Sequence, residues 1–190
     1  QMELIALVKR DCETCQLVVP VLATLRSVHR LTIYSQDDPS FPEATGGAED
    51  DRSLEHSWRH QVEVVPTLIR IDGGGEVGRV EGWDRAAWLE LTELGILGDE
   101  LPPYQPGCGS RTCELGMPER LSLRFGDLRL QSRRIEVPEE GDPIEIAFER
   151  GWSDGLPVVP PTELRVARML SGPTRKPDEI VGLIPPDLAE

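Results

Sequence analysis

Two cysteines, Cys12 and Cys15, lie between an apolar run and an amphipathic segment near the start of the chain. Residues 2–9 form a short, nearly continuous apolar run that ends in charge, which is typical of a buried strand. After Cys15 the apolar residues recur at helical spacing. Asp11 is placed as the helix N-cap, and Pro20 is expected to kink the helix axis. The sequence therefore predicts a strand, a tight turn, a CxxC motif and a helix, in that order.

The next 70 residues continue the alternation of strands and helices. The expected elements are a strand at residues 30–35, a long exposed acidic loop at 36–51, a helix at 53–61 capped by Ser53, strands at 67–71 and 77–81 around a glycine turn, and a helix at 84–97 capped by Asp84. The predicted order of elements over residues 2–98 is βαβαββα, which defines an α/β fold.

The motif Val65-Pro66-Thr67 stands about 50 residues after the CxxC and opens the predicted hairpin. Together these features resemble the thioredoxin family over roughly residues 3–97, about half of the chain. The resemblance implies a thioredoxin-like fold in which the Val65–Pro66 peptide bond is cis and lies against the CxxC. It also implies that Val65 supplies backbone groups that pair with a bound substrate chain, so Val65, Pro66 and Thr67 are the expected substrate-binding residues.

The placement of the two thiols predicts their roles in thiol–disulfide exchange. A thiolate is the attacking species, and exposed N–H groups at a helix N-terminus stabilise it. Cys12 is therefore the expected nucleophile. Cys15, one turn into the helix, is the expected resolving thiol that attacks Cys12 in a mixed disulfide. The alternative is that both are buried structural cysteines.

The other two cysteines, Cys108 and Cys113, lie in a segment rich in proline and glycine. One hypothesis makes them a second dithiol on a tether, able to exchange electrons with Cys12 and Cys15. A second gathers all four cysteines into one tetrahedral zinc or iron–sulfur site, with CxxC and Cx4C as ligand pairs. A third is a local disulfide or free thiols. The first and third require no cofactor.

Proline and glycine become denser after about residue 98, which indicates a change of organisation. The predicted divisions are a thioredoxin-like domain at residues 2–98, a cysteine-bearing linker at 99–150 and an extended arm at 151–190. The linker is expected to form short strands at 121–125 and 144–148. The arm is expected to form a helix at 163–170, capped by Thr162, and a helical turn at 178–181.

The arm carries apolar residues that it cannot bury by itself, because its prolines prevent a sheet or a long helix. Such a surface normally covers something. We therefore expect the arm to dock on a protein partner or a second subunit. The stretch at residues 151–170 is similar to a segment of larger bacterial proteins of poorly defined function, where it opens a domain.

The net charge of −14 at pH 7 argues against a nucleic-acid or anionic-membrane surface, because phosphates would be repelled. No apolar run reaches the ~18 residues that span a bilayer, and no leader pattern opens the chain, so the expected location is the cytoplasm.

The sequence predicts a thiol–disulfide oxidoreductase that acts through its CxxC on a protein or small-molecule disulfide. Two alternatives remain: a non-catalytic thioredoxin-like subunit of a larger enzyme complex, and a protein that binds zinc or an iron–sulfur cluster through four cysteines.

Overall fold

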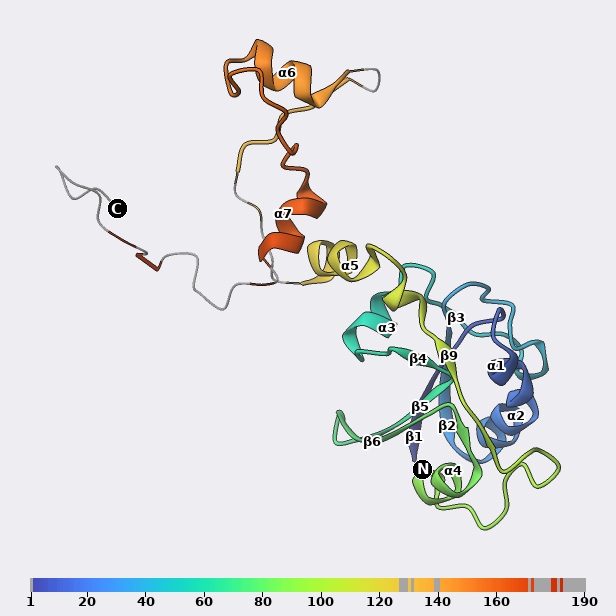
Figure 1. The fold of residues 1–190 in the computed structure, drawn as a ribbon. Coiled ribbons are helices and arrows are strands. Elements are labelled where there is room, and N and C mark those ends of the chain that lie inside the picture. Colours follow the sequence, from blue (N-terminus) through green and yellow to red (C-terminus); the bar gives the residue numbers. More distant parts are fainter. Residues whose placement is uncertain are drawn as a thin grey trace. The chain divides into compact units, whose positions relative to one another are not determined.

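The computed structural model describes residues 2–126, 130, 132–138, 141–170, 172, 179–180 and 182, and the chain divides into two compact units. Unit 1 comprises residues 1–125, and unit 2 comprises residues 126–190. The boundary differs from the one expected at residue 98, because residues 99–125 pack on the N-terminal unit rather than forming a separate linker (Figure 1).

Unit 1 is built on a mixed five-stranded sheet. Its strands are β1 (Glu3–Val8), β2 (Arg30–Ser35), β3 (Glu49–Asp50), β5 (Thr67–Asp72) and β6 (Gly75–Glu81). Their order in the sheet is β3-β2-β1-β5-β6, in which β1 runs parallel to β2 and antiparallel to β5. The central strand β1 is buried along most of its length because it has neighbours on both sides and helices over the sheet.

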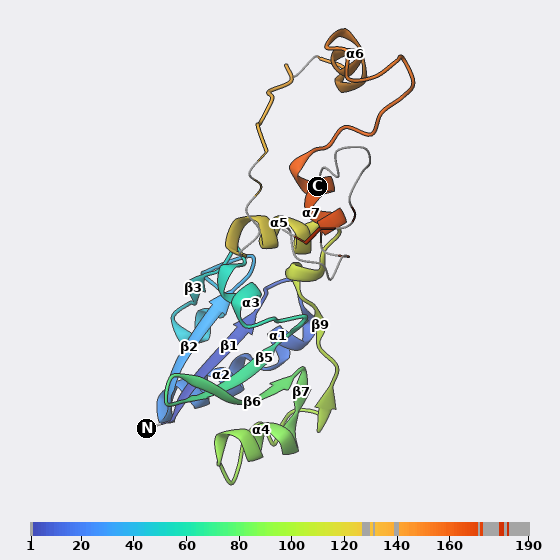
Figure 2. The same cartoon turned by 90° about the vertical axis from the view of Figure 1, so that its left-hand side faces the viewer.

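The helices of unit 1 are α1 (Glu13–Leu17), α2 (Val19–Val28), α3 (Glu55–Arg59), α4 (Arg85–Thr92) and α5 (Met117–Phe125). Helices α1 and α2 lie along one face of the sheet (Figures 1 and 2). Strands, helices and hairpin follow each other in the predicted βαβαββα order, with short additional elements. The mixed α/β class and the thioredoxin-like arrangement predicted for this half are therefore confirmed.

The helix after the CxxC differs from its prediction in two ways. It is divided at Val18 into α1 and α2, and Pro20 lies in the first turn of α2, where its missing N–H breaks no hydrogen bond. The N-cap is Cys12 rather than Asp11, because the Sγ atom of Cys12 accepts a hydrogen bond from the backbone N–H of Cys15 at 3.3 Å.

The acidic segment at residues 36–51 is not the exposed loop that its composition predicted. It contains a 3₁₀ turn, η1 (Glu43–Thr45), and strand β3, and it buries Gln36, Phe41 and Asp51. The Asp51 carboxylate accepts hydrogen bonds from the backbone N–H and the hydroxyl of Ser57, at 2.9 and 2.6 Å. The segment is therefore fixed to the start of α3 by buried polar contacts.

Residues beyond α4 add short elements to unit 1. They are β8 (Tyr104–Gln105), which pairs with β7 (Trp83–Asp84), β9 (Cys108–Gly109), which pairs with β4 (Val64–Val65), and the 3₁₀ turn η2 (Arg111–Cys113). The strand expected at residues 121–125 is wrong, because these residues belong to α5. Leu121 is buried there, and the ring of Phe125 lies 6.2 Å from that of Trp58.

Two tryptophans are fully buried where β7 meets α4. The rings of Trp83 and Trp88 meet edge to face at 5.2 Å. Both indole N–H groups are satisfied, since Trp83 donates to the carbonyl of Pro102 at 2.6 Å and Trp88 to that of Gly82 at 3.0 Å. This pair holds the backbone around Gly82 in place.

The described residues of unit 2 form two helices, α6 (Pro143–Glu149) and α7 (Glu163–Leu170). The strand expected at residues 144–148 is wrong, because Asp142 caps a helix whose first residue is Pro143. The predicted bounds of α7 are confirmed. Residues 179 and 180 are not helical, and the rest of the turn expected at 178–181 lies outside the described residues.

Candidate redox site

Cys12 lies at the N-terminus of α1 and forms a disulfide with Cys108, across 96 residues of sequence. The two Cα atoms are 5.9 Å apart, within the usual range for a disulfide. The side chain of Cys12 is almost completely buried, and its Sγ atom lies 3.5 Å from the carbonyl oxygen of Val65. The structure thus links the CxxC to a cysteine whose partner the sequence left open.

The strand that carries Cys108 pairs with the backbone next to Pro66. In the antiparallel β4–β9 pair, Cys108 lies opposite Val65 and Gly109 opposite Val64. The Val65–Pro66 peptide bond is cis, the conformation expected from the sequence. Cys108 therefore occupies the place at which the family resemblance expects a bound substrate chain.

We use the name docked segment for residues 104–113, which lie against the rest of unit 1 in both views (Figures 1 and 2). Two side chains from the CxxC region bind its backbone on either side of Cys108. The hydroxyl of Thr14 donates to the carbonyl of Pro106 at 2.6 Å, and the ammonium group of Lys9 donates to the carbonyl of Gly109 at 2.9 Å. The covalent link is thus flanked by a hydrogen bond in each direction along the chain.

A fully buried glutamine, Gln36, binds the C-terminal part of the docked segment. Its side-chain amide donates to the hydroxyls of Ser57 and Ser110, at 2.8 and 2.7 Å, and its side-chain carbonyl accepts from the backbone N–H of Arg111 at 3.0 Å. The guanidinium of Arg111 donates to the backbone carbonyl of Gln36 at 2.9 Å. Sequence reasoning missed Gln36, because a polar residue in an acidic stretch carries no signal of burial.

Two glycines allow the docked segment to approach the rest of unit 1. A Cβ atom on Gly107 would overlap Cγ1 of Val64 and lie 2.8 Å from the carbonyl oxygen of Val65. Gly82 has a φ of +71°, and a Cβ atom there would lie 2.7 Å from the backbone nitrogen of Gly107. Both positions therefore require glycine for this close contact.

Cys15 remains a thiol and is fully buried behind Cys12. Burial raises the pKa of Cys15 to about 12, although the backbone N–H of Lys9, 3.5 Å from Sγ, and the charge of Lys9 act in the opposite direction. At neutral pH this thiol is protonated, so it is a poor nucleophile until something removes its proton.

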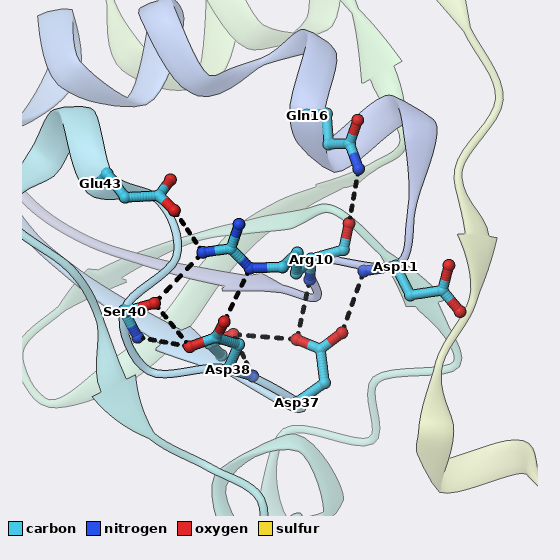
Figure 3. Close-up of polar contacts among 8 residues, drawn as sticks. Arg10, Asp11, Gln16, Asp37, Asp38, Ser40 and Glu43 are labelled. Carbon is cyan, nitrogen blue, oxygen red and sulfur yellow. Dashed lines mark hydrogen bonds and ion pairs between the residues drawn. The ribbon is translucent and has the colours of Figure 1, made fainter.

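The turn before Cys12 is held by carboxylates that follow strand β2 (Figure 3). Asp37 accepts hydrogen bonds from the backbone N–H groups of Arg10 and Asp11, at 2.8 and 3.0 Å, while the guanidinium of Arg10 binds Asp38 at 2.7 Å and also Glu43. Burial acts to raise the pKa of Asp37, but these N–H groups outweigh it and hold that pKa below its usual range. The backbone leading into the CxxC is thus fixed.

The remaining predicted site residues lie around this centre. The hydroxyl of Thr67 is buried and donates to the carbonyl of Val64 at 2.6 Å, so it stabilises the turn at Pro66. Cys113 is an exposed thiol at the end of the docked segment, with Sγ 3.8 Å from the carbonyl of Glu63.

In the part of the chain that the structure describes, no group of three or more histidine, cysteine, aspartate or glutamate side chains is arranged to hold a metal ion. Two of the four cysteines in the alternative metal site, Cys12 and Cys108, are joined to each other. Metal ligation by cysteine requires thiolates, so a four-cysteine site would first need this disulfide to be reduced.

No protein-family model matches the chain, and no curated protein matches it. Among solved structures it is similar to the crystal structure of StoA from Bacillus subtilis, with 14% sequence identity and a TM-score of 0.39, over 49% of this chain and 82% of that chain. The fold assignment rests on the strand order and the helix positions of unit 1. None of the described helices is both long and apolar enough to cross a membrane.

Proposed function

We propose that the protein is a thiol–disulfide oxidoreductase that acts through Cys12 and Cys15. One observation carries this proposal: Cys12 is covalently joined to an extended strand that pairs with Val65 beside Pro66. This is the arrangement that a mixed disulfide between the CxxC and a polypeptide substrate requires, because the substrate must present one sulfur to Cys12 while its backbone is held.

In the proposed reaction the Cys12 thiolate attacks one sulfur of a substrate disulfide, and the other sulfur leaves as a thiolate. The resulting mixed disulfide is held by backbone pairing with Val64 and Val65. Cys15 then attacks Cys12, which releases the reduced substrate and forms the Cys12–Cys15 disulfide. A second thiol donor must reduce that disulfide before the next cycle.

Trapping experiments test the two roles in a background that lacks Cys108 and Cys113, so that the internal disulfide cannot compete. We expect Cys15→Ser to accumulate a stable mixed disulfide with a model disulfide protein, because the resolving thiol is absent. We expect Cys12→Ser to accumulate none. The measurement is non-reducing electrophoresis with mass-spectrometric mapping. Equal trapping by the two variants would contradict the assignment.

A non-catalytic subunit is the second candidate, and the extent of docking favours it. The docked segment is held by Lys9, Thr14 and Gln36, and Cys15 is deeply buried. In this case the Cys12–Cys108 disulfide is structural. It would resist millimolar dithiol under native conditions, and the variant without Cys108 and Cys113 would show no exchange with any disulfide.

We further propose that unit 2 docks on a protein partner through apolar side chains of residues 151–170. Trp152, Leu156, Val159 and Met169 are 53%, 68%, 76% and 76% exposed. Exposed large apolar side chains close together in the sequence support this proposal, because apolar surface left in water often marks a site of protein interaction.

Truncation after Phe125 should separate this docking function from the redox site. Every residue of the main core cluster lies between residues 2 and 108. We therefore expect the free energy of unfolding of unit 1, measured with urea, to change by less than about 0.5 kcal/mol. The truncated chain should no longer associate with the protein partner that the full chain binds. Sedimentation velocity measures this association for both chains. A truncated chain without a cooperative transition would show instead that unit 2 is needed for folding.

A further inference from the structure

The segment that fills the candidate substrate groove belongs to the same chain, and contacts hold it on both sides of the cysteine. Cys108 is bonded to Cys12, its backbone pairs with Val65, and the carbonyls of Pro106 and Gly109 are bound by Thr14 and Lys9. Of these contacts, only the disulfide involves the thiols themselves. The others bind a polypeptide backbone and so define what kind of molecule the groove holds.

The residue before the cysteine is restricted by its surroundings. At Gly107 any side chain would meet Val64 and the carbonyl of Val65, and the backbone of Gly82 closes the other side. A side chain there can be accommodated only if the strand moves away from β4, which would break the pairing. The groove therefore selects glycine immediately before the reacting cysteine.

We propose that the docked segment is a tethered substrate of the Cys12–Cys15 site, and that the site takes extended polypeptides with glycine immediately before the cysteine. This inference rests on the proposed function and names its substrate class. Thr14 and Lys9 are the positioning residues that bind the backbone on either side of that cysteine.

The docked segment also carries a second cysteine, Cys113, which is a free thiol and can take part in disulfide exchange. The Cys12–Cys108 disulfide can be exchanged for either of two other disulfides, and the chain is neither oxidised nor reduced in either exchange. If the Cys15 thiolate attacks Cys12, the Cys12–Cys108 bond breaks, Cys12–Cys15 forms and Cys108 leaves as a thiolate. If the Cys113 thiolate attacks Cys108, then Cys108–Cys113 forms and Cys12 leaves as a thiolate.

Neither step needs an outside oxidant or reductant, because one disulfide is exchanged for another. The first step leaves two thiols on the docked segment, and the second leaves two thiols on the CxxC. The segment is thus a dithiol carrier that the groove receives in place of an external substrate.

Substrate selection can be measured with the full chain carrying Cys108→Ser and Cys113→Ser. One synthetic peptide has the sequence of residues 104–112 with its cysteine linked to thionitrobenzoate, and a second has valine in place of the glycine that corresponds to Gly107. We expect the glycine peptide to release thionitrobenzoate at least ~10-fold faster, because valine prevents backbone pairing. A small aromatic disulfide without a peptide serves as the reference for thiol reactivity.

The Thr14→Val variant provides the matched test of positioning. The ratio of its rate with the glycine peptide to its rate with the small disulfide should fall about 5-fold, the loss expected for one hydrogen bond. Equal rates with the two peptides would overturn the inference while leaving the proposed function intact. Absence of reaction with all three disulfides would overturn the proposed function itself.

Disulfide mapping of the full chain tests the carrier role. With one oxidising equivalent per chain, we expect three species: Cys12–Cys15, Cys12–Cys108 and Cys108–Cys113. Cys15→Ser should remove the first, and Cys113→Ser should remove the third. If the wild-type chain forms only Cys12–Cys108 after equilibration with a dithiol buffer, the segment is not a carrier.

Discussion

The rate at which Cys15 displaces Cys108 from Cys12 should increase about tenfold for each pH unit between pH 7 and pH 10. Burial raises the pKa of Cys15 to about 12, so the thiol stays protonated throughout this range. The attacking thiolate is then a small fraction that grows tenfold per unit as the pH approaches the pKa from below. The total expected change is roughly a thousandfold.

This rate is measured in the Cys113→Ser variant, in which Cys15 is the only internal attacking thiol. The Cys12–Cys108 form is transferred to each pH, alkylated after a fixed time, and the Cys12–Cys15 form is quantified by mass spectrometry. Cys15→Ser is the control and should show no internal displacement. A rate that levels off near pH 9 would show that the buried thiol ionises as an ordinary cysteine and would contradict the prediction.

Trp88→Ala should lower the free energy of unfolding of unit 1 by about 3–5 kcal/mol, the usual cost of removing a large buried aromatic side chain. Trp88 is completely buried, packs edge to face on Trp83 and donates its indole N–H to Gly82. The substitution leaves a cavity and an unpaired carbonyl at the point where Gly82 lies against Gly107.

The measurement is urea unfolding under conditions that keep the disulfide intact. The matched control is Trp152→Ala, because Trp152 is 53% exposed and belongs to unit 2. We expect the control to change the stability of unit 1 by less than about 0.5 kcal/mol. Similar losses for the two variants would contradict the assignment of the core to unit 1.

The core of the fold could be predicted because its elements carry strong local signals. The strand at Arg30–Ser35 was predicted with its observed bounds, and the glycine turn marked the β5–β6 hairpin. The two strands expected at residues 121–125 and 144–148 failed for one shared reason. Over five residues, alternating apolar positions also place two apolar residues at i and i+4, so a short run fits a helix equally well.

At residues 144–148 the cap decides between helix and strand. Asp142 followed by Pro143 is a helix start, and it precedes the run that was read as a strand. The division at Val18 was likewise missed, since proline in a first turn and proline inside a helix look alike until the helix start is known.

The candidate site was only partly visible in the sequence. The CxxC and the Val65-Pro66 turn were found from their motifs, but the partner of Cys12 was not. Four cysteines allow three pairings into two disulfides, and spacing does not choose among them. The choice is made by backbone pairing between β4 and β9 and by the contacts of Gln36, which involve residues far apart in the chain.

The Cys12–Cys108 disulfide also couples redox chemistry to folding. It joins residues 96 apart, and closing a loop of about 100 residues stabilises a folded chain by about 4.7 kcal/mol in the chain-entropy model. Because linkage is reciprocal, folding must stabilise the disulfide by the same amount. This corresponds to a reduction potential roughly 100 mV more negative in the folded than in the unfolded chain. A partner, a temperature change or a mutation that loosens unit 1 would therefore make the same disulfide a stronger oxidant.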